Sequence, residues 1–479
     1  MNEIFIMSTV LAYFGLLLLI SRFTEKRSDN DAFFRGNRRS PWHVVAFGMI
    51  GASLSGVTFV SVPGMVRSMD MTYLQTCMGF FFGYLIVAFV LLPLYYKLNL
   101  TSIYTYLNRR FGLCSYRTGA SFFLLSKLTG AAVRLYLVCM ILQRFLFDTF
   151  RIPFFLTAVI VLVLIWFYTR KSGIRTIVWT DCLQTFVLLL ALILIIVQTM
   201  GQMNLSVPEA WHTIWQSEYS RIFVWDDWAD RQHFLKQFLS GIFIVIVMTG
   251  LDQDMMQKNL TCRNIKEAQK NMCCYGLSFV PVNFLFLALG ILLLAFARQG
   301  GLVLPEAGDD VLPFLCVGGY LGRAVLACFS IGIIAAAFSS ADSALTALTT
   351  SFCVDIMQRP EDEPLRKRVH WLVALLFLVF ILLFRALNNT SVIDAVYLLA
   401  SYTYGPLLGL FAFGLLTRRM PCERYVPVVA VLSPLICLAI ERLTLLYTGY
   451  RFGYEMLMCN GLLTFIGLWL LSCPVFKRV

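Results

Sequence analysis

Long apolar segments recur along almost the whole chain, and they restrict its fold more than any other feature. A helix needs about 20 apolar residues to cross a bilayer. Charged residues make up only 14% of the 479 residues, against about 25% in an average soluble protein. The sequence therefore predicts an all-α integral membrane protein of about 13 transmembrane helices and excludes a soluble globular protein. The expected spans are 4–21, 43–66, 73–97, 119–143, 153–169, 176–200, 233–257, 272–297, 321–350, 369–385, 391–417, 425–447 and 453–473.

The net charge of +12 is explained by orientation in the membrane. Of the 39 Lys and Arg residues, 26 fall in connections on the side of the first loop and 11 on the opposite side. Positively charged connections favour the cytoplasmic side. We therefore expect a multi-pass protein of the cell membrane with its N-terminus outside and its C-terminus in the cytoplasm. The charge then requires no nucleic-acid partner, and two cations, Lys127 and Arg134, remain inside the fourth span.

The second span is unusually rich in small and polar residues. Between Phe47 and Pro63 it contains Gly48, Gly51, Gly56, Ser53, Ser55, Ser61 and Thr58. Small residues permit close helix packing, and proline can kink a helix within the membrane. This density also predicts a broken helix, whose freed backbone carbonyls could bind a cation.

The ninth span carries hydroxyls and a carboxylate on one helical face. Ala336, Ser339, Ser340 and Ser343 are spaced as neighbours on a helix, and Asp342 follows Ser339 by three residues. Hard oxygen ligands of this kind suit an alkali cation better than a soft metal. The alternative is that the hydroxyls bond back to their own helix, with Asp342 beside a water-filled cavity.

Ionisable side chains inside a membrane are functional candidates by default. Arg134 in the fourth span and Asp181 at the start of the sixth are of this kind. A central Arg costs about 2.5–3.5 kcal/mol on insertion scales, so Arg134 either belongs to a structural ion pair or meets an anionic substrate. No nucleotide-binding loop, nucleophile elbow or zinc motif is present. We therefore expect neither enzymatic activity nor a cofactor.

Several motifs occur in a recognisable order along the chain. They are the Pro-Gly segment Ser55–Gly64, the inner-loop segment Thr105–Gly112, Val178–Gln184 with the pattern WTDxxQ, Asp252–Lys258, Ala336–Ser343 continued by Ser351–Ile356, and Gly405–Phe411. Together they resemble the sodium/solute symporter family, with Lys258 where Arg is usual. In that family, the segment matching Ser55–Gly64 is a core helix that ends at Pro-Gly.

The resemblance implies a single transporter domain over residues 1–479 with the LeuT-like fold. In this fold five core helices are followed by five of opposite topology, here with one helix before the repeats and two after them. The expected segments are 1–42 (leading helix and inner loop), 43–200 (first repeat), 201–232 (outer Trp-rich loop), 233–417 (second repeat) and 418–479 (two trailing helices). Residues 201–232 hold four of the nine Trp residues, which predicts an outer interfacial segment with a short helix, and a substrate-gating lid is the alternative.

The resemblance also implies the positions of the binding sites. The principal sodium site would use carbonyls of Gly51 and Leu54 in the second span, with Ala52 as the alternative register for Gly51. From the ninth span it would use the Ala336 carbonyl and the hydroxyls of Ser339 and Ser340. A candidate second sodium site would use Asp181, Ser339, Asp342 and Ser343. The substrate would lie against Ser53, Ser55 and Thr58, with Arg134 meeting a carboxylate.

The function implied is sodium-coupled secondary active symport by alternating access. The imported solute would be small and organic: sialic acid or another carboxylate, a sugar or an amino acid. Sugar carriers are expected to have Gln at the position of Thr58, which disfavours a glucose-type substrate. The alternative is a proton-coupled or ion-independent permease of the same fold, with Asp342 as the proton carrier. Sodium as coupling ion, the solute and the lipid bilayer are the expected partners, and the sequence leaves the oligomeric state open.

Overall fold

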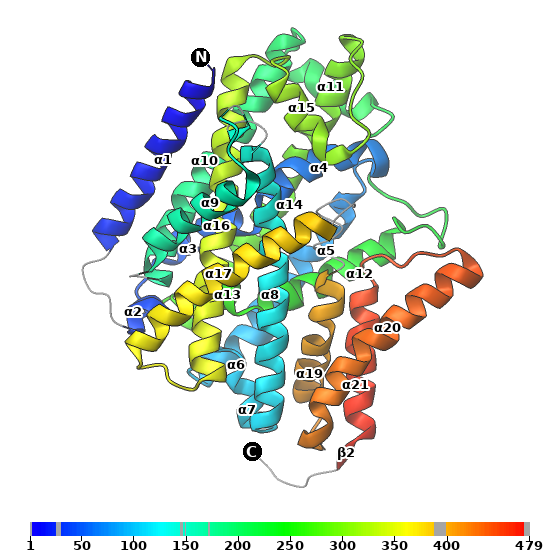
Figure 1. Ribbon diagram of the computed structural model, residues 1–479. Coiled ribbons are helices and arrows are strands. Elements are labelled where there is room, and N and C mark those ends of the chain that lie inside the picture. The colour runs from blue at the N-terminus through cyan, green and yellow to red at the C-terminus, as the bar shows by residue number, and fades with distance from the viewer. Residues whose placement is uncertain are drawn as a thin grey trace.

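The computed structural model describes residues 2–24, 30–143, 147–148, 150–170, 173–387 and 399–473. Within these residues the regular structure is almost entirely helical (Figure 1), which confirms the predicted all-α class. The exception is one antiparallel pair of two-residue strands, β1 (Met420–Pro421) and β2 (Ser472–Cys473). Parts of the predicted chain lie outside the described residues: Lys26 and Arg27 in the first loop, residues 391–398 of the eleventh span, and the tail from 474.

The helices follow the predicted spans closely. They are α1 (Asn2–Thr24), α2 (Asn30–Arg35), α3 (Trp42–Ser53), α4 (Gly56–Met69), α5 (Tyr73–Ile86), α6 (Leu92–Lys97), α7 (Thr105–Arg110), α8 (Leu113–Leu142), α9 (Phe154–Thr169), α10 (Ile174–Gln202), α11 (Val207–Gln216), α12 (Phe234–Val245), α13 (Gln253–Asn259), α14 (Ile265–Gln299), α15 (Val311–Val317), α16 (Arg323–Ser351), α17 (Glu363–Leu387), α19 (Gly405–Leu416), α20 (Val426–Thr448) and α21 (Met456–Leu470). The π-helical turns η2 (Val87–Leu91), η4 (Ile246–Gly250) and η6 (Phe352–Ile356) continue α5, α12 and α16.

Among the described residues, seven helices are long and apolar enough to cross a membrane, or nine if each of two bent pairs counts as one span. Three further apolar helices are shorter. Each of the predicted spans contains helical residues, but the number of thirteen crossings and the division into segments stay predictions.

The second span is broken, as its sequence predicts. The axes of α3 and α4 differ in direction by 57°, and Leu54 and Ser55 lie between the two helices. Pro63 and Gly64 lie within α4, which continues to Met69, three residues beyond the expected span 43–66. Gly64 permits close packing: a Cβ atom there would lie 2.0 Å from the carbonyl oxygen of Gly308.

The seventh span is also broken, which the sequence analysis did not predict. The helix formed by α12 and η4 bends by 70° relative to α13. Asp252 lies at this bend and caps α13, since its carboxylate accepts hydrogen bonds from the backbone N–H groups of Asp254 (2.9 Å) and Met255 (3.3 Å). The first helix of each expected repeat is therefore interrupted.

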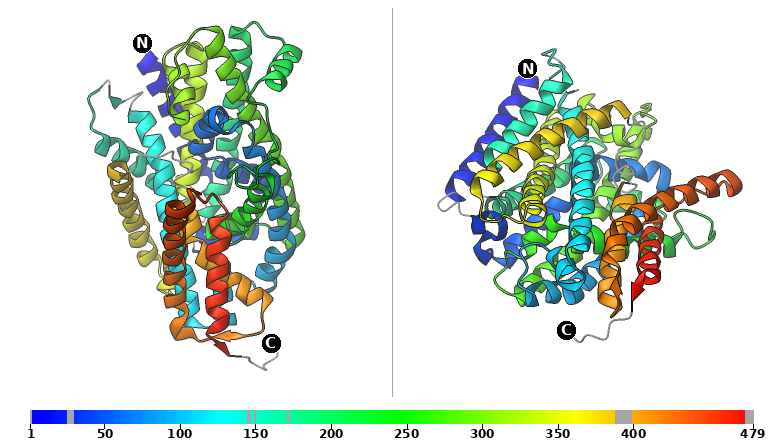
Figure 2. Two further views of the ribbon diagram at one scale, coloured as in Figure 1. Left: turned by 90° about the vertical axis from the view of Figure 1, so that its right-hand side faces the viewer. Right: turned by 60° about the horizontal axis from the view of Figure 1, so that its bottom comes forward.

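The two broken helices lie among the long helices of the centre. α10 packs against both α3 and α16, and α14 packs against α3, α4 and α5. At the periphery, α1 lies at one edge of the molecule and α20 with α21 at the opposite edge (Figure 1 and Figure 2). Large apolar side chains such as Leu435 and Leu443 of α20 are about half exposed, as expected of a helix that faces lipid.

The Trp-rich segment 201–232 contains the expected short helix, α11. Its role as an interfacial segment or as a gating lid stays a prediction. Ser206 and Glu209 form a capping box at the start of α11. Trp211 and Trp215 of α11 contact the ring of Phe284 on α14 yet remain about half exposed. Half-exposed Trp side chains suit the membrane–water interface.

Candidate functional site

A polar cavity of about 110 Å³ lies where the two broken helices meet α8 and α16. All four predicted substrate residues, Ser53, Ser55, Thr58 and Arg134, line this cavity, so the structure brings them together from two distant spans. Other polar lining residues are Tyr84, Ser126, Lys127, Thr249, Asp252, Asp254, Ser340 and Tyr404. A cavity of this size and polarity holds water readily.

Arg134 contributes a positive charge to the cavity. It lies on α8, and its side chain makes no hydrogen bond or ion pair with the part of the chain that the structure describes. The two explanations of Arg134 from sequence were a structural ion pair and an anionic ligand. No carboxylate of the described residues forms a salt bridge with Arg134, although Asp252 and Asp254, both paired with Lys127, line the same cavity.

Lys127 lies on the same helix, two turns before Arg134, and is paired with two carboxylates. Its Nζ lies 3.1 Å from Oδ2 of Asp252 and 2.7 Å from Oδ2 of Asp254. The hydroxyl of Tyr404 donates a hydrogen bond of 2.6 Å to the same oxygen of Asp252. Sequence reasoning did not select Asp252, Asp254 or Tyr404 as site residues. Asp252 and Asp254 could have been predicted as site residues, because two carboxylates within the predicted span 233–257 are costly in a membrane.

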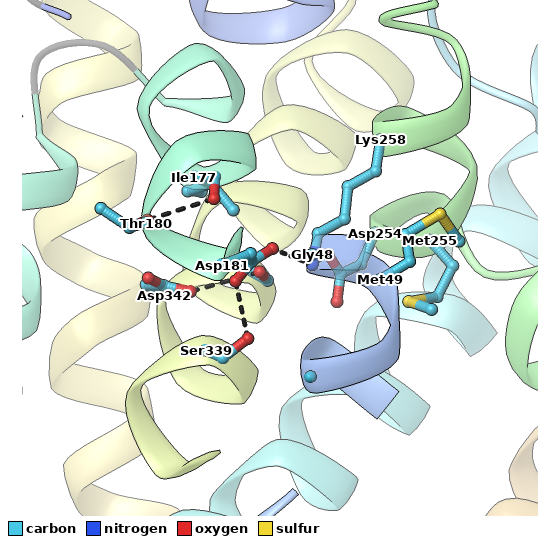
Figure 3. Close-up of polar contacts among 12 residues, drawn as sticks. Gly48, Met49, Ile177, Thr180, Asp181, Asp254, Met255, Lys258, Ser339 and Asp342 are labelled. Carbon is cyan, nitrogen blue, oxygen red and sulfur yellow. Dashed lines mark hydrogen bonds and ion pairs between the residues drawn. The ribbon is translucent and has the colours of Figure 1, made fainter. Parts of the chain in front are cut away.

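Asp181 is the centre of a second polar cluster (Figure 3). One of its carboxylate oxygens accepts a hydrogen bond of 2.6 Å from Ser339 of α16, and the other lies 2.8 Å from Nζ of Lys258 on α13. Asp342 of α16 points toward Asp181, and the hydroxyl of Ser343 donates to Asp342 at 3.2 Å. The structure thus gathers the residues of the candidate second sodium site. Asp181 is not a lone charge, and Lys258 is a member that sequence reasoning missed.

The residues of the principal sodium site lie on α3, at the break, and on α16. The hydroxyl of Ser340 donates to the carbonyl of Ala336 at 3.3 Å, which is the back-bonding alternative considered from sequence. Ser339 instead turns its hydroxyl toward Asp181. On α16 the two adjacent serines therefore face different partners, with Ser340 on the cavity.

On α3, the close approach of α10 explains why a glycine occupies position 51. Its backbone N–H donates to Oγ1 of Thr185 at 3.0 Å, and a Cβ atom at Gly51 would lie only 2.1 Å from that oxygen. Its neighbour Ala52 lines the cavity, and Leu54 is buried at the break. Whether the carbonyl of Gly51 or of Ala52 serves as a ligand stays open.

A chain of hydroxyls extends one wall of the cavity. Ser53 and the hydroxyl of Tyr275 on α14 are hydrogen-bonded, and the hydroxyl of Tyr84 on α5 donates to Tyr275 at 2.7 Å. Sequence reasoning missed both tyrosines, because in their spans an aromatic side chain is indistinguishable from core packing.

Curated relatives of this chain are sodium-coupled symporters. The "Sodium/sialic acid symporter NanT" of Aliivibrio fischeri is 28% identical, over 85% of this chain and 82% of that protein. The "Sodium/sialic acid symporter SiaT" of Proteus mirabilis is 26% identical, over 86% and 84%. The human "Sodium/iodide cotransporter" is 24% identical, over 84% of this chain and 63% of that protein.

Solved structures show the same fold. A Na+-coupled sialic acid symporter in a substrate-bound outward-open state superimposes with a TM-score of 0.81 at 21% identity, over 98% of this chain and 99% of that one. The nucleobase-cation-symport-1 family transporter Mhp1, in a closed conformation, matches with a TM-score of 0.57 at 15% identity, over 91% and 93%. The fold is thus LeuT-like. The sequence profile of the sodium:solute symporter family matches residues 33–423, most of the chain, and the protein belongs to this family of sodium-coupled membrane symporters.

Proposed function

We propose that this symporter carries sodium together with a small organic solute that bears a carboxylate, and that Arg134 receives the carboxylate. The observation that carries the proposal is the guanidinium of Arg134, which lines the cavity and forms no salt bridge among the described residues, while Asp252 and Asp254 of the same cavity are paired with Lys127. A guanidinium matches a carboxylate through two parallel hydrogen bonds. An anionic solute would supply the negative charge that pairs with the guanidinium of Arg134 inside the membrane.

The rest of the cavity favours a solute that also carries hydroxyls. Ser53, Ser55, Thr58 and Tyr84 place hydroxyl groups around it, and each can donate or accept a hydrogen bond. A sugar acid would use both the guanidinium and these hydroxyls. Two relatives named as sodium/sialic acid symporters support this chemistry. A simple monocarboxylate or an amino acid would leave most of the hydroxyls unused.

The proposed principal sodium site lies between the broken second span and α16. Its ligands are the carbonyls of Gly51, Leu54 and Ala336 and the hydroxyls of Ser339 and Ser340. A bound ion would hold the break against α16 and so complete the cavity, which Ser340 and Ala52 also line. One positive charge moving inward gains about 2.3 kcal/mol per 100 mV. A carboxylate that moves inward with the ion loses the same amount, so transport of one sodium ion with one anionic solute is driven by the sodium concentration gradient alone. A tenfold sodium gradient, equivalent to about 1.4 kcal/mol, then supports about a tenfold solute gradient.

The proposed orientation follows from the excess of Lys and Arg on the cytoplasmic side, and it places the N-terminus outside and the C-terminus in the cytoplasm. The two expected repeats, 43–200 and 233–417, each begin with a broken helix. Discontinuous helices at corresponding positions are typical of inverted-repeat transporters, whose sites lie at the breaks. This correspondence supports the proposed segments and an alternating-access cycle.

The second candidate is a proton-coupled permease of the same fold. It is favoured by one observation: the Asp342 side chain points toward Asp181 in a buried cluster (Figure 3). A carboxylate in such surroundings could carry a proton. Uptake that depends on pH and not on sodium would select this candidate.

The serine pair on α16 tests the sodium site. We expect Ser340→Ala to raise the sodium concentration for half-maximal uptake by about tenfold, the equivalent of about 1.4 kcal/mol of lost ion binding. Folding should change less, because the hydroxyl donates only to its own helix. The measurement is sodium-dependent solute uptake into proteoliposomes.

The matched control is Ser330→Ala. Ser330 lies on the same helix and bonds back to Leu326 at 2.8 Å, but it does not line the cavity. Its sodium dependence should equal that of the unchanged protein. Equal sodium dependence of Ser340→Ala and Ser330→Ala would remove Ser340 from the sodium site.

A further inference from the structure

Tyr275 is a tyrosine of α14 that lies behind the wall of the cavity. It is fully buried and is not one of the residues that line the cavity. Its hydroxyl nevertheless contacts two residues that do. It shares a hydrogen bond with Ser53, and it accepts a hydrogen bond of 2.7 Å from Tyr84. One phenol oxygen therefore connects two hydroxyl groups of the cavity wall.

The two connected hydroxyls come from different helices. Ser53 is the last residue of α3, directly before the break in the second span, whereas Tyr84 lies on α5. α14 packs against both of these helices. Tyr275 thus holds the end of a broken helix and a residue of its neighbour in a fixed arrangement.

The packing of the rings keeps the Tyr275 hydroxyl in place. The ring centroids of Tyr275 and Tyr84 are 4.5 Å apart, and Phe279, one turn further along α14, contacts both rings. The residue after Tyr275 is Gly276, where a Cβ atom would lie only 2.8 Å from Cβ of Tyr84. A larger residue at this position would push α5 away from α14 and separate the two tyrosines.

The hydroxyl of Ser53 has another possible partner on its own helix. A serine in a helix can turn its hydroxyl back to the carbonyl four residues earlier, as Ser340 does with Ala336. For Ser53 this carbonyl belongs to Met49. Tyr275 competes with that arrangement. A hydroxyl that is already held in its binding position costs the solute less free energy to order.

We propose that Tyr275 is a positioning residue for the solute. Its hydroxyl fixes those of Ser53 and Tyr84 in the cavity wall, and it thereby determines the preference for a solute that carries hydroxyls as well as a carboxylate. A hydroxyl that forms one hydrogen bond can still form others, so both groups remain able to bind the solute. The inference rests on the proposed function, which places the solute in this cavity.

The test is the Kd of a sialic acid for the purified full-length protein at saturating sodium, measured by isothermal titration calorimetry. Tyr275→Phe removes only the hydroxyl, and we expect it to raise the Kd about fivefold, the usual effect of one lost hydrogen bond. The same substitution is then added to a protein that already carries Ser53→Ala and Tyr84→Phe. There it should leave the Kd unchanged, because no hydroxyl remains for Tyr275 to position.

Tyr96→Phe is the matched control. Tyr96 does not line the cavity either, and its hydroxyl donates to the carbonyls of Asn259 and Cys262 at 3.0 and 3.2 Å. The control therefore removes a tyrosine hydroxyl with hydrogen bonds to another segment, yet leaves the cavity wall intact. Its Kd should equal that of the unchanged protein.

If the protein with both Ser53→Ala and Tyr84→Phe binds too weakly to titrate, Ser53→Ala alone serves as the background. Tyr275→Phe should then raise the Kd only about twofold, the share that acts through Tyr84.

Two results overturn the inference. An unchanged Kd of Tyr275→Phe would show that its hydroxyl does not contribute to solute binding. An equal rise of the Kd in the unchanged and in the substituted background would show that Tyr275 supports the fold and does not act through Ser53 and Tyr84. The absence of sialic acid binding by the unchanged protein would instead contradict the proposed solute, and the inference with it.

Discussion

Arg134→Ala is expected to lower kcat/KM for uptake of the carboxylate solute by at least about 30-fold. Truncating one partner of a buried, hydrogen-bonded charge pair costs about 2–5 kcal/mol of binding, and about 1.4 kcal/mol corresponds to a factor of ten. The melting temperature should change little, because Arg134 forms no salt bridge among the described residues. Initial uptake rates in proteoliposomes and thermal unfolding in detergent measure the two quantities.

Two further variants sharpen this prediction. Arg134→Lys keeps the charge but loses the planar fork of the guanidinium, so it should retain part of the activity. Arg117→Ala removes an exposed arginine of the same helix, outside the cavity, and should transport normally. Transport of the carboxylate by Arg134→Ala at the rate of Arg117→Ala would contradict the assignment of Arg134.

Lys127→Met is expected to destabilise the protein by about 3–5 kcal/mol, the cost of leaving buried charges without their partner. Lys127 bridges Asp252 and Asp254 at 3.1 and 2.7 Å, and its side chain is 9% exposed. Its removal leaves two carboxylates beside the break between η4 and α13. The measurement is the melting temperature of the purified protein in detergent.

The companion variants separate charge from packing. Lys127→Arg preserves the charge and should melt closer to the unchanged protein. Adding Asp254→Asn to Lys127→Met removes one of the uncompensated carboxylates and should recover part of the loss. A melting temperature of Lys127→Met equal to that of the unchanged protein would show that the pair contributes little to the folded state.

Features that depend on residues close together in the sequence were predictable. Runs of apolar residues define the helices, because the bilayer fixes their length. The break between α3 and α4 followed from the density of Gly and Ser around Leu54 and Ser55. The common cavity of Ser53, Ser55, Thr58 and Arg134 followed from a resemblance that places the second and fourth spans together.

Pairings between distant residues were not predictable from the sequence. Lys127 and Asp252 are separated by 125 positions, and no local pattern links them. The break in the seventh span depends on Asp252, whose carboxylate caps α13 while it also pairs with Lys127. The directions of the Ser339 and Ser340 hydroxyls differ because one meets Asp181 and the other meets its own helix.

The most direct test of the central claim is uptake driven by an imposed ion gradient. Proteoliposomes containing the protein would be given either an inward sodium gradient at constant pH or an inward proton gradient without sodium. The solutes would be a sialic acid, a small monocarboxylate and a neutral sugar. The account predicts that the sodium gradient alone drives accumulation, and only of a solute that bears a carboxylate. Accumulation that follows the proton gradient and ignores sodium, or equal accumulation of the neutral sugar, would contradict it.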